Sequence, residues 1–278
     1  MRHTKPTPED ALRTLEHYAE AFRDLVNARV WPANQSPSKA LRLNSSVDWE
    51  FICVAMDVVG DAALAIDNFL CFSLDGPTRY ENMGERYLRL YGLLSASYLQ
   101  QEAVRKLYAL MNCASPRQVD NEFAQLEIRT LRHQVASHSV DYRMPGTTEL
   151  SSFVPVRIGL AGYSCMVTEG RGESTRTIQL QDAVLAHCVA VASVLDRTYE
   201  KSLQTLFRGQ RAKIAEFQAK LEDLRSMRDG NLIIRAVVGS NPMEIRVQLV
   251  DANHAKQASE APGVARSKPK SRRSPHDA

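Results

Sequence analysis

Long segments with the apolar spacing of an α-helix are the feature that most constrains the fold of this chain. Apolar residues recur every three or four positions over residues 8–30, 48–72, 82–111 and 182–207, and a shorter stripe runs from 214 to 228. A helix with one apolar stripe is stable only when that stripe is buried against another element. Long helices joined by modest loops satisfy this requirement best as an antiparallel bundle.

Capping residues set the expected ends of several of these helices. Thr7 stands at the N-cap position, Pro8 at the first helical position, and two acids follow in the first turn. The sequence LDGPT, residues 74–78, ends the second helix. Ser115 and Pro116 repeat the pattern of cap and proline, which predicts a fourth bundle helix that runs on into residues 131–142.

A change of pattern after Pro145 and Gly146 predicts a small β region. The segments SSFVPVRIGL, AGYSCMVTE and STRTIQLQ are short, rich in Val, Ile, Tyr and Thr, and separated by glycine-containing turns, so they predict two or three strands of a hairpin or meander. GRGES, residues 170–174, lacks the Lys-Ser or Lys-Thr of a phosphate-binding loop and is a hairpin turn. NLIIRAVV and MEIRVQLV, joined by GSNP, predict one more hairpin near the C-terminus.

The expected architecture is therefore mainly α, an antiparallel helical bundle with a small β insertion and a C-terminal extension. Residues 1–206 form the bundle, interrupted by the β insertion at about 147–181. Residues 207–250 form an extension made of a helix and a hairpin, and residues 251–278 form a disordered basic tail.

The basic charge of the chain is confined to that tail. The net charge of +3 equals the excess of six Lys or Arg over three acids from Asp251 onward, so residues 1–250 are neutral. A neutral body carries no general attraction for polyanions. The tail offers a contact for RNA, but a purely solubilising role is the more common one for such tails.

Composition also excludes several classes of protein. No apolar run approaches the roughly 20 residues of a membrane-spanning helix, and the N-terminus lacks the apolar core of a signal peptide, so we expect a cytoplasmic protein without a membrane partner. Five cysteines are scattered, mostly within apolar helical patterns, and no pair has metal-ligand spacing. We therefore expect reduced, buried thiols and neither a metal ion nor another cofactor.

The segment LRHQVASHSVDY, residues 131–142, carries most of the functional information. Arg132 is followed directly by His133, and His138 comes five residues later. RNA can be cleaved without a metal if a base removes the 2′-hydroxyl proton and a cation neutralises the charge that develops on phosphorus. Histidine titrates near neutrality and suits the first task, whereas the permanently charged, fork-shaped arginine suits the second.

In its setting, at the end of a long helix and just before a loop, this segment resembles the HEPN superfamily of helical domains. Many members carry Arg, then four to six residues, then His, usually with a polar residue after the Arg; Arg132, His133 and His138 match those positions. The tyrosine-rich segment ERYLRLYGLLSASYLQQEAV is also similar to helices of that superfamily. The resemblance covers roughly residues 8–142 and the helix from Asp182. It departs at Tyr142, which lies four residues after the histidine instead of the two seen in some toxin members.

The resemblance implies a metal-independent endoribonuclease that leaves a 2′,3′-cyclic phosphate. It assigns phosphate stabilisation to Arg132, acid/base catalysis to His138 and an orienting or assisting role to His133. It further implies RNA as the substrate, a homodimer in which both motifs line one cleft, and a toxin or antiphage role with a possible antitoxin or other protein partner. The alternative is a non-catalytic helical module for ligand sensing or protein interaction.

Helix geometry leaves two arrangements open for this motif. On an unbroken helix, Arg132 and His138 lie about 120° apart, because each residue turns by ~100°. Either the helix ends near Ser137, or the site is shared across a two-fold axis. In the structural alternative, Arg132 packs beside the core and His138 caps the C-terminus of the helix.

Three other features have simpler interpretations. Glu50, Asp57, Asp61 and Asn68 share one face of the second helix, which is more typical of a solvated face than of a carboxylate metal site. His187 lies in an apolar segment and is expected to be a hydrogen-bonded core histidine. The stripe on residues 214–224 suits either a partner helix at a dimer interface or a helix that covers the bundle; it comprises Ile214, Phe217, Leu221 and Leu224.

Overall fold

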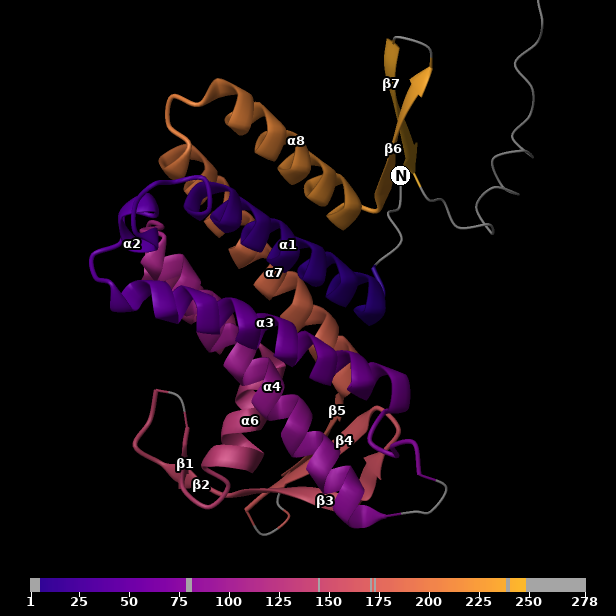
Figure 1. Ribbon diagram of the computed structural model, residues 1–278. Coiled ribbons are helices and arrows are strands. Elements are labelled where there is room, and N and C mark those ends of the chain that lie inside the picture. Colours follow the sequence, from indigo (N-terminus) through magenta and orange to yellow (C-terminus); the bar gives the residue numbers. More distant parts are fainter. Residues whose placement is uncertain are drawn as a thin grey trace, which may run out of the picture.

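The computed structural model describes residues 6–78, 82–144, 146–170, 172, 174–238 and 241–248. Most of these residues are helical, and the long helices pack side by side (Figure 1). The helices are Pro8–Val30 (α1), Pro37–Ala40 (α2), Val47–Phe72 (α3), Met83–Leu110 (α4), Pro116–Ala124 (α5), Glu127–Arg132 (α6), the π turn His133–Ser137 (η1), Leu180–Leu206 (α7) and Arg211–Arg228 (α8). The expected mainly helical bundle is confirmed. The basic tail predicted for residues 251–278 lies outside the described residues.

The strands form separate small antiparallel sheets. They are Tyr142–Arg143 (β1), Leu150–Ser151 (β2), Phe153–Ala161 (β3), Ser164–Glu169 (β4), Ser174–Gln179 (β5), Asn231–Val238 (β6) and Asn241–Gln248 (β7). Strands β3, β4 and β5 make the predicted meander, and β6 pairs with β7 as the predicted C-terminal hairpin. The short β1–β2 ladder was not predicted; it begins the β region before residue 147.

The expected start of the first helix is confirmed in detail. The Thr7 side chain accepts a hydrogen bond from the backbone N–H of Asp10, and Pro8 opens the helix. Asn82 caps α4 in the same way, accepting from the N–H groups of Gly84 and Glu85. These bonds satisfy donors that the first turn of a helix otherwise leaves free.

The prediction of one continuous fourth helix was wrong. The chain is helical over α5, becomes extended at Leu126 with φ −73° and ψ 129°, and is helical again over α6. Leu126 packs against the core at this break, so tertiary packing overrides the local helical pattern. Ser115 also fails as a cap, because it adopts a left-handed conformation with φ 57° and its side chain makes no capping bond.

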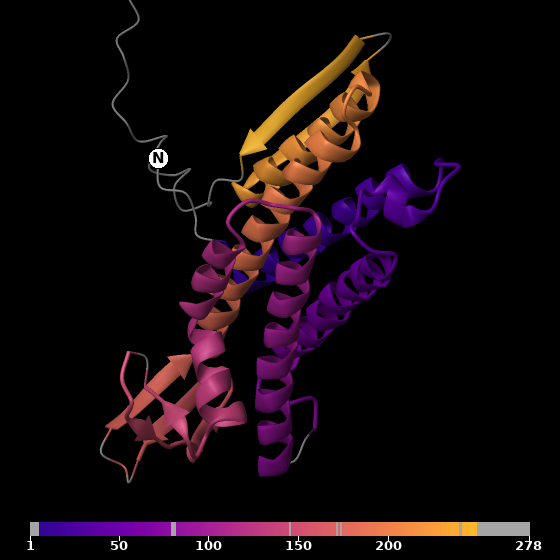
Figure 2. The same ribbon diagram turned by 90° about the vertical axis from the view of Figure 1, so that its left-hand side faces the viewer.

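The three-stranded sheet lies at one end of the bundle, beside the start of α4 and below α6 (Figures 1 and 2). Side chains near the start of α4 hold it there. The Arg86 guanidinium donates to the carbonyl of Leu160 at 2.8 Å, and the Tyr87 hydroxyl donates to the carbonyl of Pro155 at 3.3 Å. These two bonds tie β3 to the start of α4.

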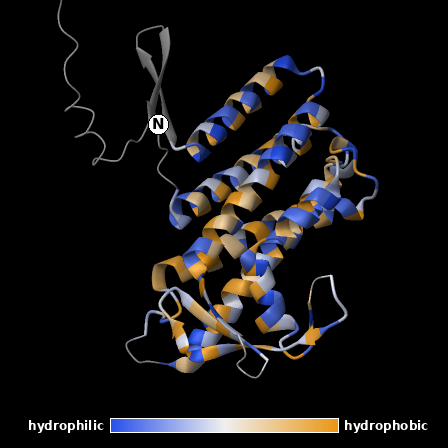
Figure 3. Cartoon of the chain, turned by 180° about the vertical axis from the view of Figure 1, so that it is seen from behind, coloured by the Kyte–Doolittle hydropathy of each residue, from blue (hydrophilic) through white to orange (hydrophobic). Residues whose placement is uncertain are grey.

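The C-terminal helix α8 covers the bundle. Phe217, Leu221 and Leu224 of its apolar stripe are buried, and the Tyr199 hydroxyl on α7 donates to the Phe217 carbonyl at 3.1 Å. The rest of the helix is largely hydrophilic (Figure 3). The sequence left open whether this stripe packs at a dimer interface or on the bundle. In the structure it packs on helices of the same chain.

Candidate functional site

A π turn separates α6 from the loop that follows it. The backbone N–H of His138 donates to the carbonyl of His133 at 2.8 Å, a bond between residues five apart. Such a turn brings side chains five positions apart onto one face, and short π-helical segments are frequent at functional sites. The rings of His133 and His138 consequently stack, with centroids 6.3 Å apart and planes inclined by 26°. The helix therefore ends near Ser137, one of the two arrangements that the spacing left open.

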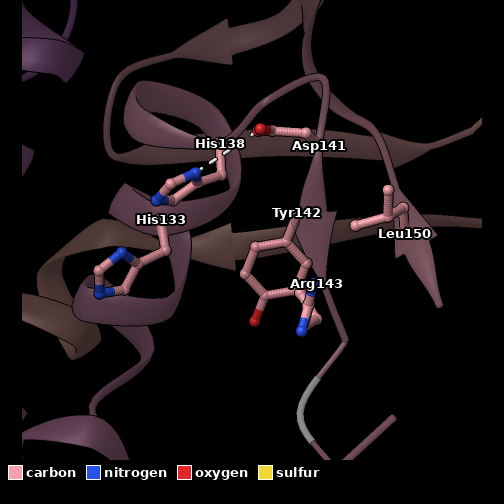
Figure 4. Close-up of a pocket in the computed structure, with 6 residues that line it drawn as sticks. All are labelled: His133, His138, Asp141, Tyr142, Arg143 and Leu150. Atoms are coloured by element: carbon pink, nitrogen blue, oxygen red, sulfur yellow. Dashed lines mark ion pairs between the residues drawn. The ribbon is translucent and has the colours of Figure 1, made fainter. Parts of the chain in front are cut away.

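The two histidines open onto a pocket of about 450 Å³ that we call the histidine pocket. Figure 4 shows His133 and His138 on the helical side of the pocket, with Tyr142 and Arg143 opposite them. The pocket is lined by His133, His138, Asp141, Tyr142, Arg143 and Leu150. The His138 side chain is 56% exposed, so it is accessible to a ligand.

Asp141 is the partner of His138. One of its carboxylate oxygens lies 3.4 Å from Nδ1 of the imidazole, an ion pair when the ring is protonated (Figure 4). This contact leaves Nε2 of His138 as the ring nitrogen available to a ligand. A carboxylate that orients an imidazole in this way is a common companion of catalytic histidines.

Strand β1 forms the opposite wall. The Tyr142 ring meets the Phe153 ring edge-on, with centroids 5.3 Å apart, and the backbone N–H of Phe153 donates to the carbonyl of Ser139 at 2.7 Å. Tyr142 is thereby fixed to β3, the first long strand of the β insertion. The insertion thus supplies one side of the histidine pocket.

Arg132, the arginine of the motif, does not line the histidine pocket. Its guanidinium carbon lies 3.8 Å from the centroid of the Tyr98 ring, a close cation–π contact. The guanidinium of Arg129 approaches the same ring at 4.9 Å, and His133 meets it edge-on at 6.0 Å. The structure therefore brings Arg132 and His133 together around Tyr98 on α4, whereas His133 and His138, without Arg132, line the pocket.

The surroundings of His133 favour its neutral form. Partial burial lowers the pKa of this imidazole below its ordinary value of 6.5, and the positive charges of Arg132 and Arg129 lower it further. Glu102 acts in the opposite direction. At neutral pH, His133 is therefore an uncharged imidazole that can accept a proton.

A side chain from the β insertion bridges α6 and the π turn. Arg176 on β5 donates to the Gln134 side chain at 2.7 Å and to the Glu127 carboxylate at 2.9 Å. Gln134 belongs to the π turn and is 7% exposed, whereas Glu127 begins α6. Arg176 thus ties the two ends of this short helical segment to the sheet.

Sequence reasoning singled out both histidines but missed Asp141 and Arg143, and it left the role of Tyr142 open. One available signal was the acid three residues after His138, within reach of its ring. Another was the pattern Tyr142-Arg143 before MPGTTEL, in which a short strand precedes turn-forming residues.

The acidic face of α3 is solvated. Glu50, Asp57 and Asp61 are exposed, and Asp57 pairs with Arg23 at 3.0 Å. Within the described parts of the chain, no three His, Cys, Asp or Glu side chains gather as metal ligands would. In the same ranges, no helix has the length and apolar character needed to cross a membrane.

His187 is a core histidine, as expected. It is fully buried, with Nδ1 3.1 Å from the Gln101 amide nitrogen and Nε2 2.8 Å from the Gln100 amide oxygen. Burial lowers its pKa to about 3. The expectation for the thiols was wrong in part, because Cys165 and Cys188 are buried but Cys71, on the outer side of α3, is exposed.

Comparisons with protein-family models, with curated proteins and with solved structures gave no match to this chain. The likeness to the HEPN superfamily therefore stays a prediction from the motif.

Proposed function

We propose that the histidine pocket cleaves RNA by transferring protons between its two imidazoles and the substrate, without requiring a divalent metal. The observation that carries this proposal is the stacking of His133 and His138 on one face of a π turn, at the wall of an open pocket. In this proposal, the protein is an endoribonuclease of HEPN type.

The two imidazoles have surroundings that suit opposite tasks. His133, whose pKa is lowered, takes the proton of the 2′-hydroxyl as general base. The 2′-oxygen then bonds to phosphorus, and the bond from phosphorus to the 5′-oxygen breaks. His138, which Asp141 contacts through Nδ1, is the proposed general acid that gives a proton to the leaving 5′-oxygen. The products are a 2′,3′-cyclic phosphate and a free 5′-hydroxyl.

Nearby arginines favour an anionic substrate. Arg132 and Arg129 lie around Tyr98 next to His133, and Arg143 lines the pocket itself. Arg129 is paired with Glu102, so Arg132 and Arg143 are the cations that support anion binding here. Local cations of this kind attract phosphates even where residues 1–250 as a whole are neutral.

Cleavage of a mixed RNA pool in EDTA tests the proposal. We expect the wild-type protein to cut RNA, and His133→Ala and His138→Ala each to lose at least about a hundredfold in rate, the usual contribution of acid–base catalysis. His17→Ala is the matched control, because His17 on α1 has a partly exposed side chain that does not line the pocket, so its loss should leave the rate unchanged. Circular dichroism checks that all four proteins fold alike.

A second function uses the same pocket without catalysis. The stacking of Arg132 on Tyr98 keeps the arginine of the motif out of the pocket, so a group expected to stabilise the transition state is absent there, while Arg143 still offers a cation for binding an anionic ligand. Binding of RNA by a well-folded wild-type protein that never cleaves it would favour this alternative and contradict the nuclease.

A homodimer, a toxin or antiphage role and a protein partner belong to the same proposal. Light scattering measures the dimer directly. Induction of the wild-type gene in growing bacteria should arrest growth if the nuclease is a toxin, and the His138→Ala variant should not.

A further inference from the structure

The histidine pocket contains an arginine that is not part of the Arg132–His138 motif. Arg143 on β1 lines the pocket and is exposed to solvent. Among the residues that the structure describes, no hydrogen bond or ion pair holds its guanidinium, although Asp141 lies two residues away. Figure 4 shows Arg143 beside Tyr142, across the pocket from the two histidines.

Arg132 is in a different situation. Its guanidinium carbon lies 3.8 Å from the centroid of the Tyr98 ring, and Arg132 does not line the pocket. Tyr98 also contacts His133 edge-on and is approached by Arg129, which is itself held by Gln101 at 3.0 Å and Glu102 at 3.1 Å. Arg132 is thus part of a packed cluster behind His133.

We infer that Arg143 binds the phosphate of single-stranded RNA in the histidine pocket, and that Arg132 is a positioning residue for His133. This inference rests on the proposed ribonuclease function and assigns its phosphate-binding residue to the β insertion. Arg143 would make the charge-assisted hydrogen bonds to non-bridging phosphate oxygens, and Arg132 would fix the His133 ring through Tyr98.

Charge and shape both support an anionic, single-stranded ligand. Arg143, His133 and His138 bring donors into the pocket, whereas the one carboxylate of the lining, Asp141, already pairs with His138. A guanidinium binds phosphate through two parallel hydrogen bonds. The Tyr142 ring and the Leu150 side chain add aromatic and apolar surface on which an unstacked base can lie.

Binding of a fluorescent 2′-O-methyl oligonucleotide, which has no free 2′-hydroxyl and cannot be cut, tests the role of Arg143. We expect Arg143→Ala to weaken binding about tenfold or more, because a hydrogen bond to a charged group is lost. The plot of log affinity against log salt should become shallower by about 0.7, the contribution of one phosphate contact to a single strand. Arg143→Lys should restore the salt slope but only part of the affinity.

Arg157→Ala is the matched control for charge. Arg157 is exposed on β3 of the same insertion and does not line the histidine pocket. We expect this variant to bind the oligonucleotide with the affinity and salt slope of the wild type.

The pH profile of RNA cleavage tests the role of Arg132. Since the charge of Arg132 lowers the pKa of His133, Arg132→Gln should move the acid limb of kcat to higher pH while leaving the salt slope of binding unchanged. Arg143→Ala should change the salt slope and leave the acid limb in place. Each variant should thus change one property and spare the other, a pattern that a general loss of folding would not produce.

Two outcomes separate the inference from the proposed function. If the wild type cleaves RNA but the salt slope depends on Arg132 and not on Arg143, the inference is wrong and the nuclease stands. If binding depends on Arg143 as expected but no RNA is cut, the phosphate site is supported and the nuclease is contradicted.

Discussion

The two stacked imidazoles of His133 and His138 are the centre of the proposed active site. Their rings have different surroundings, since burial and two arginines act on His133 whereas His138 is exposed beside Asp141. A pair of titratable groups whose environments differ in this way can divide the roles of base and acid. Measurements that depend on pH therefore test the roles of these two histidines.

The rate of RNA cleavage should depend on pH in a way that His133 determines. A general base acts in its neutral form, so kcat should fall as the pH drops through the pKa of His133, which lies below 6.5. A stopped-time assay on one defined RNA between pH 4.5 and about 8 measures the profile. An acid limb with its midpoint above 6.5 would contradict the assignment of His133 as base.

Folding stability should depend on pH through His187. Its pKa is about 3 in the folded protein against 6.5 for a free histidine, so only the unfolded chain takes up a proton between these values. The contribution of the neutral core histidine to the free energy of unfolding is complete above pH 6.5. It is lost as the pH falls below that value, at roughly 1.4 kcal/mol per pH unit.

Urea unfolding of the wild type and of His187→Gln at pH 7, 6 and 5 measures this dependence, with the glutamine variant as the control that cannot titrate. The difference in stability between the two proteins should shrink as the pH falls. A difference that stays constant over this range would contradict the pKa given to His187.

At the scale of elements, the π turn η1 decides whether the two histidines meet. An alanine inserted after Ala136, an exposed residue within the turn, should place six positions instead of five between the two histidines. The ring of His138 would then turn away from His133, because residues six positions apart on a helix lie about 120° apart, and cleavage should fall to the level of His138→Ala. Helical content and melting temperature should change little, because the insertion falls at an exposed position of the turn.

Ala136→Ser keeps the number of residues and is the control for this insertion. It should retain the wild-type rate. If the insertion variant is as active as Ala136→Ser, the π turn does not hold the histidines in their working arrangement.

The sequence predicted the helices well because their signals are local. Thr7 and Pro8 mark the start of α1 within one turn, and apolar spacing shows the extent of α3, α4 and α7. The π turn has no comparable signal. It depends on Arg176, which contacts Gln134 from a strand 42 residues further along the chain. The break at Leu126 likewise follows from packing against the core.

The candidate site was predictable only in part for the same reason. His133 and His138 could be found as a motif, whereas Arg143 reaches the pocket through the β1–β2 ladder and Arg132 is drawn to Tyr98 on another helix. Those positions depend on pairing and packing between distant segments. Spacing along the chain carries no information about them.

At the scale of the whole molecule, a buried ion pair fixes α8 to the bundle. The Asp196 side chain on α7 is 8% exposed and accepts hydrogen bonds from Arg225 at 2.9 and 2.7 Å and from the Tyr18 hydroxyl at 2.8 Å. Removing Arg225 takes away two hydrogen bonds to this buried carboxylate and leaves only Tyr18 and the longer contact of Arg228 at 3.4 Å. Arg225→Ala should therefore lower the free energy of unfolding by roughly 3 kcal/mol, the lower end for a broken buried pair because other donors to Asp196 remain.

Chemical denaturation of Arg225→Ala measures this loss, and Lys220→Ala is the control. Lys220 also joins α8 to α1, but its pair with Asp24 at 3.2 Å is solvent-exposed and should contribute less than about 1 kcal/mol. Equal losses in the two variants would show that the buried carboxylate does not anchor α8. Since α8 lies at the opposite end of the molecule from β1 and β2 (Figure 1), neither variant should alter the acid limb of cleavage.

The most direct test of the central claim is the chemistry of the cleaved ends. A short RNA with one cleavage site and the same strand carrying a single 2′-deoxy nucleotide at that site would be incubated with the wild-type protein in EDTA. Mass spectrometry would then identify the products. The two-histidine mechanism predicts a 2′,3′-cyclic phosphate and a 5′-hydroxyl from the first strand and no cut in the second. Cleavage of the 2′-deoxy strand, or products with a 3′-hydroxyl and a 5′-phosphate, would contradict it.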